Sequence, residues 1–224
     1  MKNYIRTIWN MIKYDQKSEW DKIAYGFFKR YKIERIIDAG CGEGRFLSQD
    51  PDNIIGLDWN LKSLTKCRNS GYKVIRFDVR SLPFKDNSVP GIHCSHLIEH
   101  FPPQDAYKIL SEFDRILEVG GILVIRTPLL WDKFYSDFTH IKPYNPEAII
   151  HYLTPSSQRT LGNISEDYSV VHLKWRYIPI SINIKYVSAI FNVLSRWGFP
   201  WTRKNGYMLV LKKEAGDPSK HQEY

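Results

Sequence analysis

The chain has 224 residues, of which 43% are hydrophobic and 25% are charged, and its formal net charge is +8. This composition is typical of a soluble globular protein and excludes a disordered or fibrous class. The length suits a single domain that buries a real core. No stretch reaches the ~18 uncharged apolar residues of a membrane span, and the N-terminus lacks the apolar run of a secretory signal.

The cysteines and the charge pattern bear on compartment and partners. The three cysteines, Cys41, Cys67 and Cys94, are an odd number without zinc-type spacing, which favours a reducing cytoplasm. The two ends of the chain are basic and the middle is near neutral. Basic ends suit nucleic acid, an anionic membrane surface or an acidic substrate, and equally a basic protein with no polyanionic partner. We expect a cytoplasmic location, with peripheral membrane binding left open.

Apolar spacing predicts the elements in chain order. Two helices are expected within residues 3–31, broken near 15–18. The later predicted strands are 33–38, 54–58, 74–78, 91–95, 122–127, 168–177 and 207–212. The later predicted helices are 45–49, 61–70, 104–117 and 146–152. Alternation of this kind predicts an α/β fold, in which a parallel sheet carries helices on both faces and binds ligands at the carboxyl ends of its strands.

The most informative stretch is 36–46, IIDAGCGEGRF, where an apolar strand runs into Gly40, Gly42 and Gly44. Glycines allow positive φ and leave backbone amides free to face a ligand. The spacing G-x-G-x-G after Asp38 differs from the dinucleotide fingerprint G-x-G-x-x-G. It resembles motif I of the class I S-adenosylmethionine-dependent methyltransferases. That resemblance covers residues 33–144 and implies a Rossmann-like, seven-stranded, mostly parallel sheet with an antiparallel last strand.

The resemblance also implies S-adenosyl-L-methionine as the cofactor. Asp58, after the second strand, can accept both hydroxyls of a ribose, while Asn60 caps the next helix. Asp78, after the third strand, would take the adenine amino group, with the Val79 amide near a ring nitrogen. The predicted cofactor-binding residues are Asp38, Gly40, Cys41, Gly42, Asp58, Trp59, Asp78, Val79 and Ser95.

The acceptor side of the sequence favours transfer to oxygen. The segment 95–98 lacks the Asn/Asp-Pro-Pro-aromatic motif of base-amine methyltransferases, and no cysteine follows a proline as in C5-pyrimidine enzymes. Residues 137–144, D-x-T-H-x-x-x-Y, resemble methyltransferases that act on sugars, quinone precursors and polyketide-like products. His140 is therefore predicted as the catalytic residue, because an imidazole can take a proton from a hydroxyl at neutral pH. The alternative is that His140 only orders its loop.

A metal site is the competing interpretation of the same region. His96-x-x-Glu99-His100, together with His140, resembles the Glu-x-x-Glu-His segment of metal-binding oxygen methyltransferases, including small-RNA 2′-hydroxyl enzymes. Imidazole and carboxylate suit several transition metals. The Glu-His pair also occurs in relatives without metal, so no metal is predicted and these four residues stay candidates.

The whole chain is predicted to be one domain. Its parts are a helical cap (1–32), a cofactor-binding core (33–145), an acceptor-side half (146–214) with an insertion (178–205), and a tail (215–224). The insertion is expected to be a mobile lid over the acceptor or against an anionic membrane, with core packing as the alternative. The expected partner is a small-molecule, sugar or lipid-linked acceptor. An RNA methyltransferase and a non-catalytic binding subunit are the rival functions, and the oligomeric state is not predicted.

Overall fold

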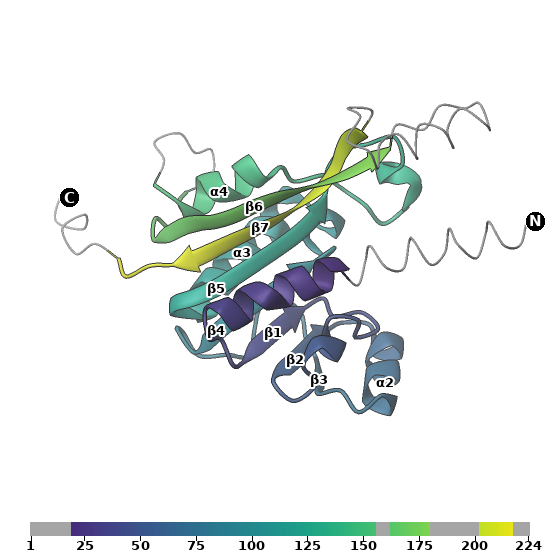
Figure 1. Ribbon diagram of the computed structural model, residues 1–224, viewed down its shortest axis with the longest axis vertical. Helices are drawn as coiled ribbons and strands as arrows, with labels where there is room; N and C mark the ends of the chain where they lie inside the picture. The colour runs from purple at the N-terminus through teal and green to yellow at the C-terminus, as the bar shows by residue number, and fades with distance from the viewer. Residues whose placement is uncertain (1–18, 156–161, 180–201, 217–224) are drawn as a thin grey trace, which may run out of the picture.

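The computed structural model describes residues 19–155, 162–179 and 202–216, and its centre is a twisted seven-stranded sheet (Figure 1). The strands are β1 (Ile36–Ala39), β2 (Ile54–Asp58), β3 (Val74–Arg76), β4 (Val89–Ser95), β5 (Leu117–Pro128), β6 (Tyr168–Pro179) and β7 (Thr202–Lys213). The helices are 19–30, α2 (Leu61–Asn69), α3 (Pro103–Ile116) and α4 (Pro146–Leu153), with short 3-10 turns η1 (Leu47–Gln49), η2 (Ile98–His100) and η3 (Phe134–Ser136).

The strand order is β3-β2-β1-β4-β5-β7-β6, and β7 runs antiparallel to both of its neighbours. Every other neighbouring pair is parallel. The predicted fold class is therefore confirmed, including the antiparallel last strand. The chain leaves β1 toward β2 and β3 and then returns to β4 on the other side of β1. The switch between β1 and β4 marks the crevice where open α/β sheets bind ligands.

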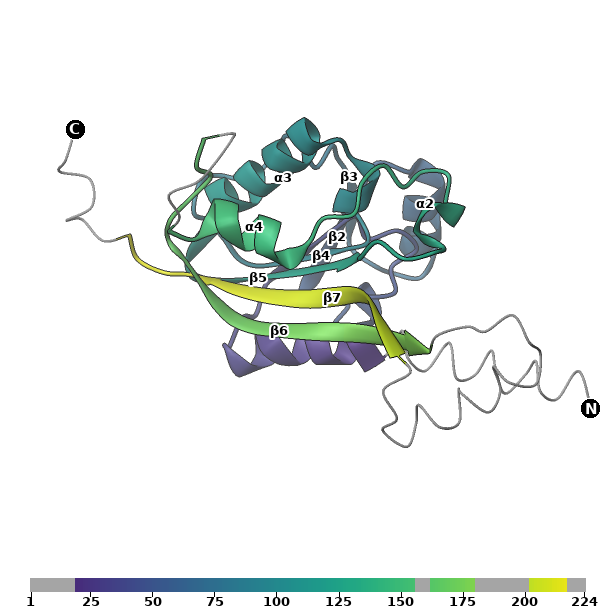
Figure 2. The ribbon, with the colours of Figure 1, turned by 90° about the horizontal axis from the view of Figure 1, so that it is seen from above.

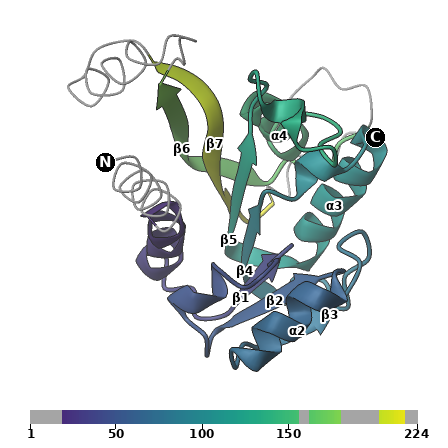
Figure 3. The same ribbon diagram turned by 90° about the vertical axis from the view of Figure 1, so that its right-hand side faces the viewer.

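The two faces of the sheet are covered by different helices. Figures 2 and 3 show helix 19–30 on one face and α3 with α4 on the other. Side chains alternate between the faces, as strands require. One core contains Phe113 of α3 and Ile149 of α4, and the other contains Phe28 of the N-terminal helix. Burying a side chain of this size contributes about 1.5–3 kcal/mol, so each face anchors its own helices.

The N-terminal helix packs across the middle of the sheet. Its residues Ala24 and Phe28 are fully buried against β1, β4 and β5. Its first turn carries Asp21, which reaches Arg45 beyond the glycine turn and Arg126 on β5. Part of the predicted helical cap is thus observed, and it borders the carboxyl ends of the strands. The predicted break near 15–18 and the first predicted helix lie outside the described residues.

The Gly120-Gly121 pair in the sequence predicts a left-handed end to the helix before β5, and this prediction is wrong. The helix α3 already ends at Ile116, and its cap residue Leu117 is extended. Gly120 keeps the left-handed φ of 84° and lies inside β5. There the register with β4 shifts between Val89, which pairs with Leu117, and Gly91, which pairs with Ile122. Because β5 carries extra residues at this point, it bulges, and glycine accommodates the bulge.

The predicted insertion is shorter than expected. β6 continues to Pro179 and β7 already begins at Thr202, so both ends of the range 178–205 are strand. The remaining residues, 180–201, lie outside the described part of the chain, and with them the lid prediction. Among the described residues, no helix is long and apolar enough to cross a membrane.

Candidate active site

The three glycines of the turn after β1 all have positive φ, at 74° for Gly40, 52° for Gly42 and 82° for Gly44. A Cβ on Gly40 would lie 2.8 Å from Leu97, and one on Gly44 would lie 2.8 Å from Tyr72. A Cβ on Gly42 would meet nothing within 4 Å. Two of these glycines therefore make room for protein side chains, whereas Gly42 borders open space that a ligand can fill.

Three backbone amides of this turn are hydrogen-bonded within the protein, at positions where the glycine pattern predicts amides that can face a ligand. Gly40 N and Cys41 N both donate to the carbonyl of Leu57, at 2.8 and 3.0 Å. Gly42 N donates to the Asp58 carboxylate at 2.8 Å. The end of β2 supplies these acceptors because it lies beside the turn in the parallel sheet. These three amides are therefore already engaged, and Gly42 offers a cofactor open space.

Asp58 joins the glycine turn to the start of α2. Its Oδ2 accepts from Gly42 N, and its Oδ1 accepts from Asn60 N at 2.7 Å. The Asn60 side chain in turn accepts from the amides of Lys62 and Ser63, which confirms it as the cap of α2. A carboxylate has about four lone-pair sites, so Asp58 keeps acceptor capacity for the hydroxyls of a ribose.

The residues predicted to bind the adenine are constrained by contacts within the protein. Asp78 is clamped by Arg80, whose Nε and Nη2 donate to its oxygens, and this hydrogen bonding lowers the pKa of Asp78. Sequence reasoning missed Arg80, although it lies two positions along the chain. Val79 is buried. Trp59 is 64% exposed and carries the guanidinium of Arg76 over its ring at 4.5 Å, which leaves the other face of the indole open.

Asp38 is paired with a histidine that the sequence analysis passed over. His93 Nδ1 lies 2.7 Å from Asp38 Oδ1, and both side chains are buried. Burial lowers the pKa of His93 although Asp38 opposes the shift, so the neutral ring donates its Nδ1 proton to the carboxylate. The ring also stacks on Phe46 at 3.7 Å. Because Asp38 and His93 are register partners in β1 and β4, strand alternation could have revealed this pair.

The end of β4 is strained and contains an unpaired polar atom. The Ser95 hydroxyl is buried and has no hydrogen-bond partner. The next residue, His96, has a φ of 55°, which is unusual for a residue other than glycine. Strain of this kind concentrates where a side chain is held for function. Together with the open space at Gly42, the free hydroxyl fits a ligand at the carboxyl ends of the strands.

Glu99, His100 and His140 form one cluster, with one ligand-type atom from each lying within 4.8 Å of the others. His140 Nδ1 lies 2.7 Å from the carbonyl of Phe134. A carbonyl only accepts, so Nδ1 must carry the proton and Nε2 keeps its lone pair. This bond is what the alternative of a loop-ordering His140 expects. The other ring nitrogen, Nε2, lies 3.9 Å from Asp137 Oδ2 and is not used by the bond to Phe134.

His100 is held in the same tautomer. Its Nδ1 lies 2.9 Å from the Thr139 hydroxyl and 3.2 Å from the Thr139 carbonyl. The hydroxyl already donates to Asp137 at 2.7 Å, so it accepts from the imidazole. His100 and His140 pack edge to face with ring centroids 4.8 Å apart. Both imidazoles thus carry a proton on Nδ1, and Nε2 is the nitrogen of each ring that can accept one.

Glu99 is the buried acid of the cluster. It is fully inaccessible, and its Oε2 accepts from the Thr127 hydroxyl at 3.1 Å. His96 Nδ1 lies 3.2 Å from Oε1. His96 therefore contacts Glu99 but does not belong to the group of three. Of the four metal candidates, the structure assembles Glu99, His100 and His140.

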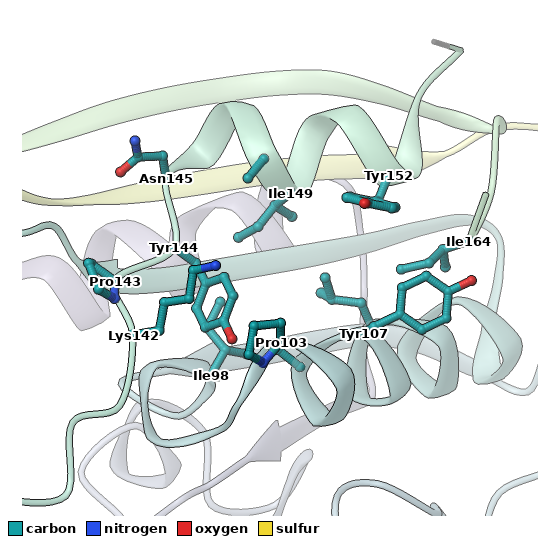
Figure 4. Close-up of a pocket in the computed structure, with 13 residues that line it drawn as sticks. Ile98, Pro103, Tyr107, Lys142, Pro143, Tyr144, Asn145, Ile149, Tyr152 and Ile164 are labelled. Carbon is teal, nitrogen blue, oxygen red and sulfur yellow. The ribbon is translucent and has the colours of Figure 1, made fainter. Parts of the chain in front are cut away.

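Two apolar features flank the cluster. A cavity of about 310 Å³ lies between α3 and α4, and its lining includes Ile98, Tyr107 and Tyr152 (Figure 4). The second feature is the segment between β5 and α4, which exposes large apolar side chains. These are Leu130, Tyr135, Phe138 and Ile141. An acceptor held beside His140 would therefore meet apolar surface.

Comparison with known proteins agrees with this geometry. Residues 37–125 match the sequence profile of a family described as "Methyltransferase domain". An uncharacterised protein of Methanocaldococcus jannaschii is 31% identical over 50% of this chain and 50% of its own length. A tRNA (carboxymethyluridine(34)-5-O)-methyltransferase of Arabidopsis thaliana is 23% identical over 70% of this chain and 40% of its own length. The chain thus spans half or less of these two relatives.

Two further proteins match over most of their length. A demethylmenaquinone methyltransferase of Bacteroides fragilis is 27% identical over 80% of this chain and 73% of its own. The crystal structure of an S-adenosylmethionine-dependent methyltransferase from Archaeoglobus fulgidus superposes with a TM-score of 0.60 at 22% identity, covering 86% of this chain and 94% of that one. Residues 37–125 thus match a methyltransferase domain, and the fold is the one found in S-adenosylmethionine-dependent methyltransferases. The cofactor of this class is S-adenosyl-L-methionine.

Proposed function

We propose that the chain transfers a methyl group from S-adenosylmethionine to an oxygen atom of a small-molecule, sugar or lipid-linked acceptor. The observation that carries this proposal is the tautomer of His140. Its Nδ1 is committed to the Phe134 carbonyl, so Nε2 is a fixed proton acceptor beyond the end of β5. This is where an α/β sheet presents catalytic groups.

The division of labour follows from the chemistry. The cofactor supplies an activated methyl group on a sulfonium, whose departure needs no acid. The protein must therefore orient the acceptor and remove a proton from its hydroxyl, and a positioned base typically contributes ~10²–10⁴-fold. Gly42 and Asp58 would hold the cofactor, and His140 would take the proton at Nε2. The hydrogen bond between the buried Asp38 and His93 fixes both side chains relative to each other next to the glycine turn.

The acceptor class is supported by the surface around the cluster. Phe138 is completely exposed and Leu130 is 63% exposed, and both lie on the segment that carries His140. Exposed apolar groups beside a catalytic residue suit an acceptor with an apolar part. The relative that acts on demethylmenaquinone is consistent with such an acceptor. Three buried free cysteines fit a cytoplasmic enzyme.

A screen of labelled methyl transfer into fractionated cell extract tests this proposal. Wild type should label one acceptor fraction, and treating that fraction with nuclease or lipase identifies its class. A nuclease-sensitive product would favour the RNA alternative, which the tRNA methyltransferase relative supports. No labelled fraction, combined with retained binding of S-adenosylhomocysteine, would favour the non-catalytic binding subunit.

A metal-assisted transfer is the second candidate mechanism. The supporting observation is that Glu99, His100 and His140 converge with both imidazoles in the tautomer that leaves Nε2 open. Two imidazoles and a carboxylate suit a transition ion such as Zn²⁺, Mn²⁺ or Ni²⁺. A chelator should then abolish transfer and one of these ions should restore it, whereas activity unaffected by chelator supports His140 as a simple base.

A further inference from the structure

Two arginines lie near the carboxyl ends of β5 and β6, the strands on either side of β7, and they differ in how their charge is balanced. Arg126 on β5 is 4% exposed and forms a buried ion pair with Asp21. Arg176 on β6 is half-buried, and among the described residues no carboxylate forms an ion pair with it. A sheltered guanidinium without a directly paired acid is costly, because neutral hydrogen-bond partners replace only part of the solvation that burial removes.

The surroundings of Arg176 hold it in one place. Its Nε donates to Asn205 Oδ1 at 3.0 Å, and its Nη2 donates to the Asn205 carbonyl at 3.3 Å. Its Nη1 lies 3.4 Å from His96 Nε2. Gly206 makes room for the group, since a Cβ there would lie 2.8 Å from Nη2. All of these partners are neutral, so they position the charge without neutralising it.

The electrostatics point the same way. Burial lowers the pKa of Arg176 to about 10, the positive charge of Arg126 adds to that effect, and the negative charge of Glu99 opposes it without a direct ion pair. The group remains a cation at neutral pH. A guanidinium has five N–H donors, and the three contacts above leave one donor on each terminal nitrogen. Such a pair matches the two oxygens of a carboxylate or phosphate.

Arg176 also connects to the proposed catalytic cluster. His96 accepts from Arg176 through Nε2, so its Nδ1 carries a proton and faces Glu99 at 3.2 Å. The strained backbone of His96 holds this bridge between the arginine and the acid. An anion on Arg176 would therefore lie on the acceptor side of the sheet edge, near the group that takes the proton.

We infer that Arg176 binds an anionic group, a carboxylate or a phosphate, carried by the methyl acceptor. The inference rests on the proposed function and narrows its substrate class. Two molecules could supply this anion, the methyl acceptor and the cofactor, because the cofactor also carries a carboxylate. The structure favours the acceptor as the source, since Arg176 adjoins His96 and Glu99 rather than the glycine turn.

The test uses ¹⁵N-labelled protein and follows the arginine Nε–H resonances, with the Arg176 signal assigned from its loss in Arg176→Lys. Inorganic phosphate and acetate are titrated separately at constant ionic strength, with chloride as the reference anion. One of the two should shift the Arg176 resonance saturably. The Arg203 resonance serves as the matched control on the same hairpin, because Arg203 is already paired with Asp132, and it should not shift.

Substitutions and the cofactor product complete the test. Arg176→Gln should weaken binding of the anion about tenfold or more, as expected for a lost charge-assisted hydrogen bond, and should leave S-adenosylhomocysteine affinity within about twofold. Gly206→Ala, which keeps the charge but displaces it, should also weaken the anion. The inference is overturned if chloride shifts the resonance equally, if neither anion binds, or if Arg176→Gln weakens S-adenosylhomocysteine instead. Failure of the wild type to bind S-adenosylhomocysteine would contradict the proposed function separately.

Discussion

The two faces of the sheet each carry a histidine beside a buried carboxylate, and the two arrangements use the imidazole differently. On the face covered by helix 19–30, His93 donates Nδ1 to Asp38, and its Nε2 is buried without a partner. On the face covered by α3 and α4, His140 belongs to the cluster with Glu99 and donates Nδ1 to the backbone, and its Nε2 lies 3.9 Å from Asp137 Oδ2. The His93 imidazole is therefore inaccessible, and the His140 imidazole remains available to a ligand.

This difference shows that residue type alone does not predict the role of a histidine beside an acid. Both sites contain a histidine near an acid, but the partner of Nδ1 and the access to Nε2 decide the role of each histidine. The face with helix 19–30 also contains the buried pair of Asp21 and Arg126. We therefore expect changes there to reduce stability, and changes in the cluster around Glu99 to reduce turnover.

The largest expected effect is on stability, from Asp21→Ala. Removing this carboxylate leaves Arg126 buried without its partner, which typically costs about 3–5 kcal/mol. Denaturant unfolding of wild type and variant measures the loss. Arg45→Gln is the matched control, since its side chain is 46% exposed and its pair with Asp21 should contribute about 0–1 kcal/mol. Equal effects of the two changes would contradict a structural role for the buried pair.

The cluster should show the opposite behaviour. His140→Ala should lower turnover ~10²-fold or more, with stability and S-adenosylhomocysteine affinity nearly unchanged. His151→Ala on α4, outside the cluster, provides the control. Transfer of labelled methyl to the acceptor fraction gives the rate, and calorimetry gives the affinity. A parallel loss of rate and cofactor affinity would show that His140 only supports the loop.

The cofactor end lies between these extremes, because Asp58 has both a structural and a binding role. Asp58→Ala removes the acceptor for Gly42 N and the proposed ribose ligand together. Binding of S-adenosylhomocysteine should weaken roughly ten- to a hundredfold. Asp52→Ala, an exposed change near the opposite end of β2, should leave binding intact. Unchanged calorimetric affinity in a folded Asp58 variant would remove the residue from the site.

The smallest expected effect is a pH dependence of stability. Burial lowers the pKa of His93, so the unfolded chain binds a proton at higher pH than the native one. Stability should therefore be complete above the unfolded pKa of about 6.5 and fall as pH drops below it, by at most about 1.4 kcal/mol per pH unit. His96 is shifted in the same direction by burial. Urea unfolding between about pH 7.5 and about pH 5.5 measures the slope, and a smaller slope in His93→Gln assigns it.

Much of the fold could be predicted because its signals are local. Strand periodicity and the glycine turn placed β1 and β2, and the Asn60 cap was found because an N-cap is written in adjacent residues. The bulge at Gly120 could not be predicted, because a glycine with positive φ is typical both of a bulge and of a helix end. The extents of β6 and β7 depend on their mutual pairing, which sequence does not show.

The site was predicted by residue but not by contact. Glu99, His100 and His140 are far apart in the chain, and the structure brings them together. Two further features depend on tertiary geometry. They are the hydrogen bonds from Arg80 to Asp78 and the bonds that three amides of the glycine turn form within the protein. The pair of Asp38 and His93 could have been found, since strand register puts both on one face. The role proposed for Arg176 could not be predicted from the sequence. It depends on the fact that no described carboxylate forms an ion pair with this side chain, which only the structure shows.

The most direct test of the account is production of S-adenosylhomocysteine from S-adenosylmethionine in the presence of the fractionated acceptor. Wild type, Asp58→Ala and His140→Ala are compared over a series of cofactor concentrations up to saturation. The account predicts rapid product formation by wild type, recovery of Asp58→Ala toward wild type as cofactor is raised, and a rate for His140→Ala that stays ~10²-fold lower at every cofactor concentration. Equal rates for His140→Ala and wild type, in folded proteins that bind the cofactor, would contradict it.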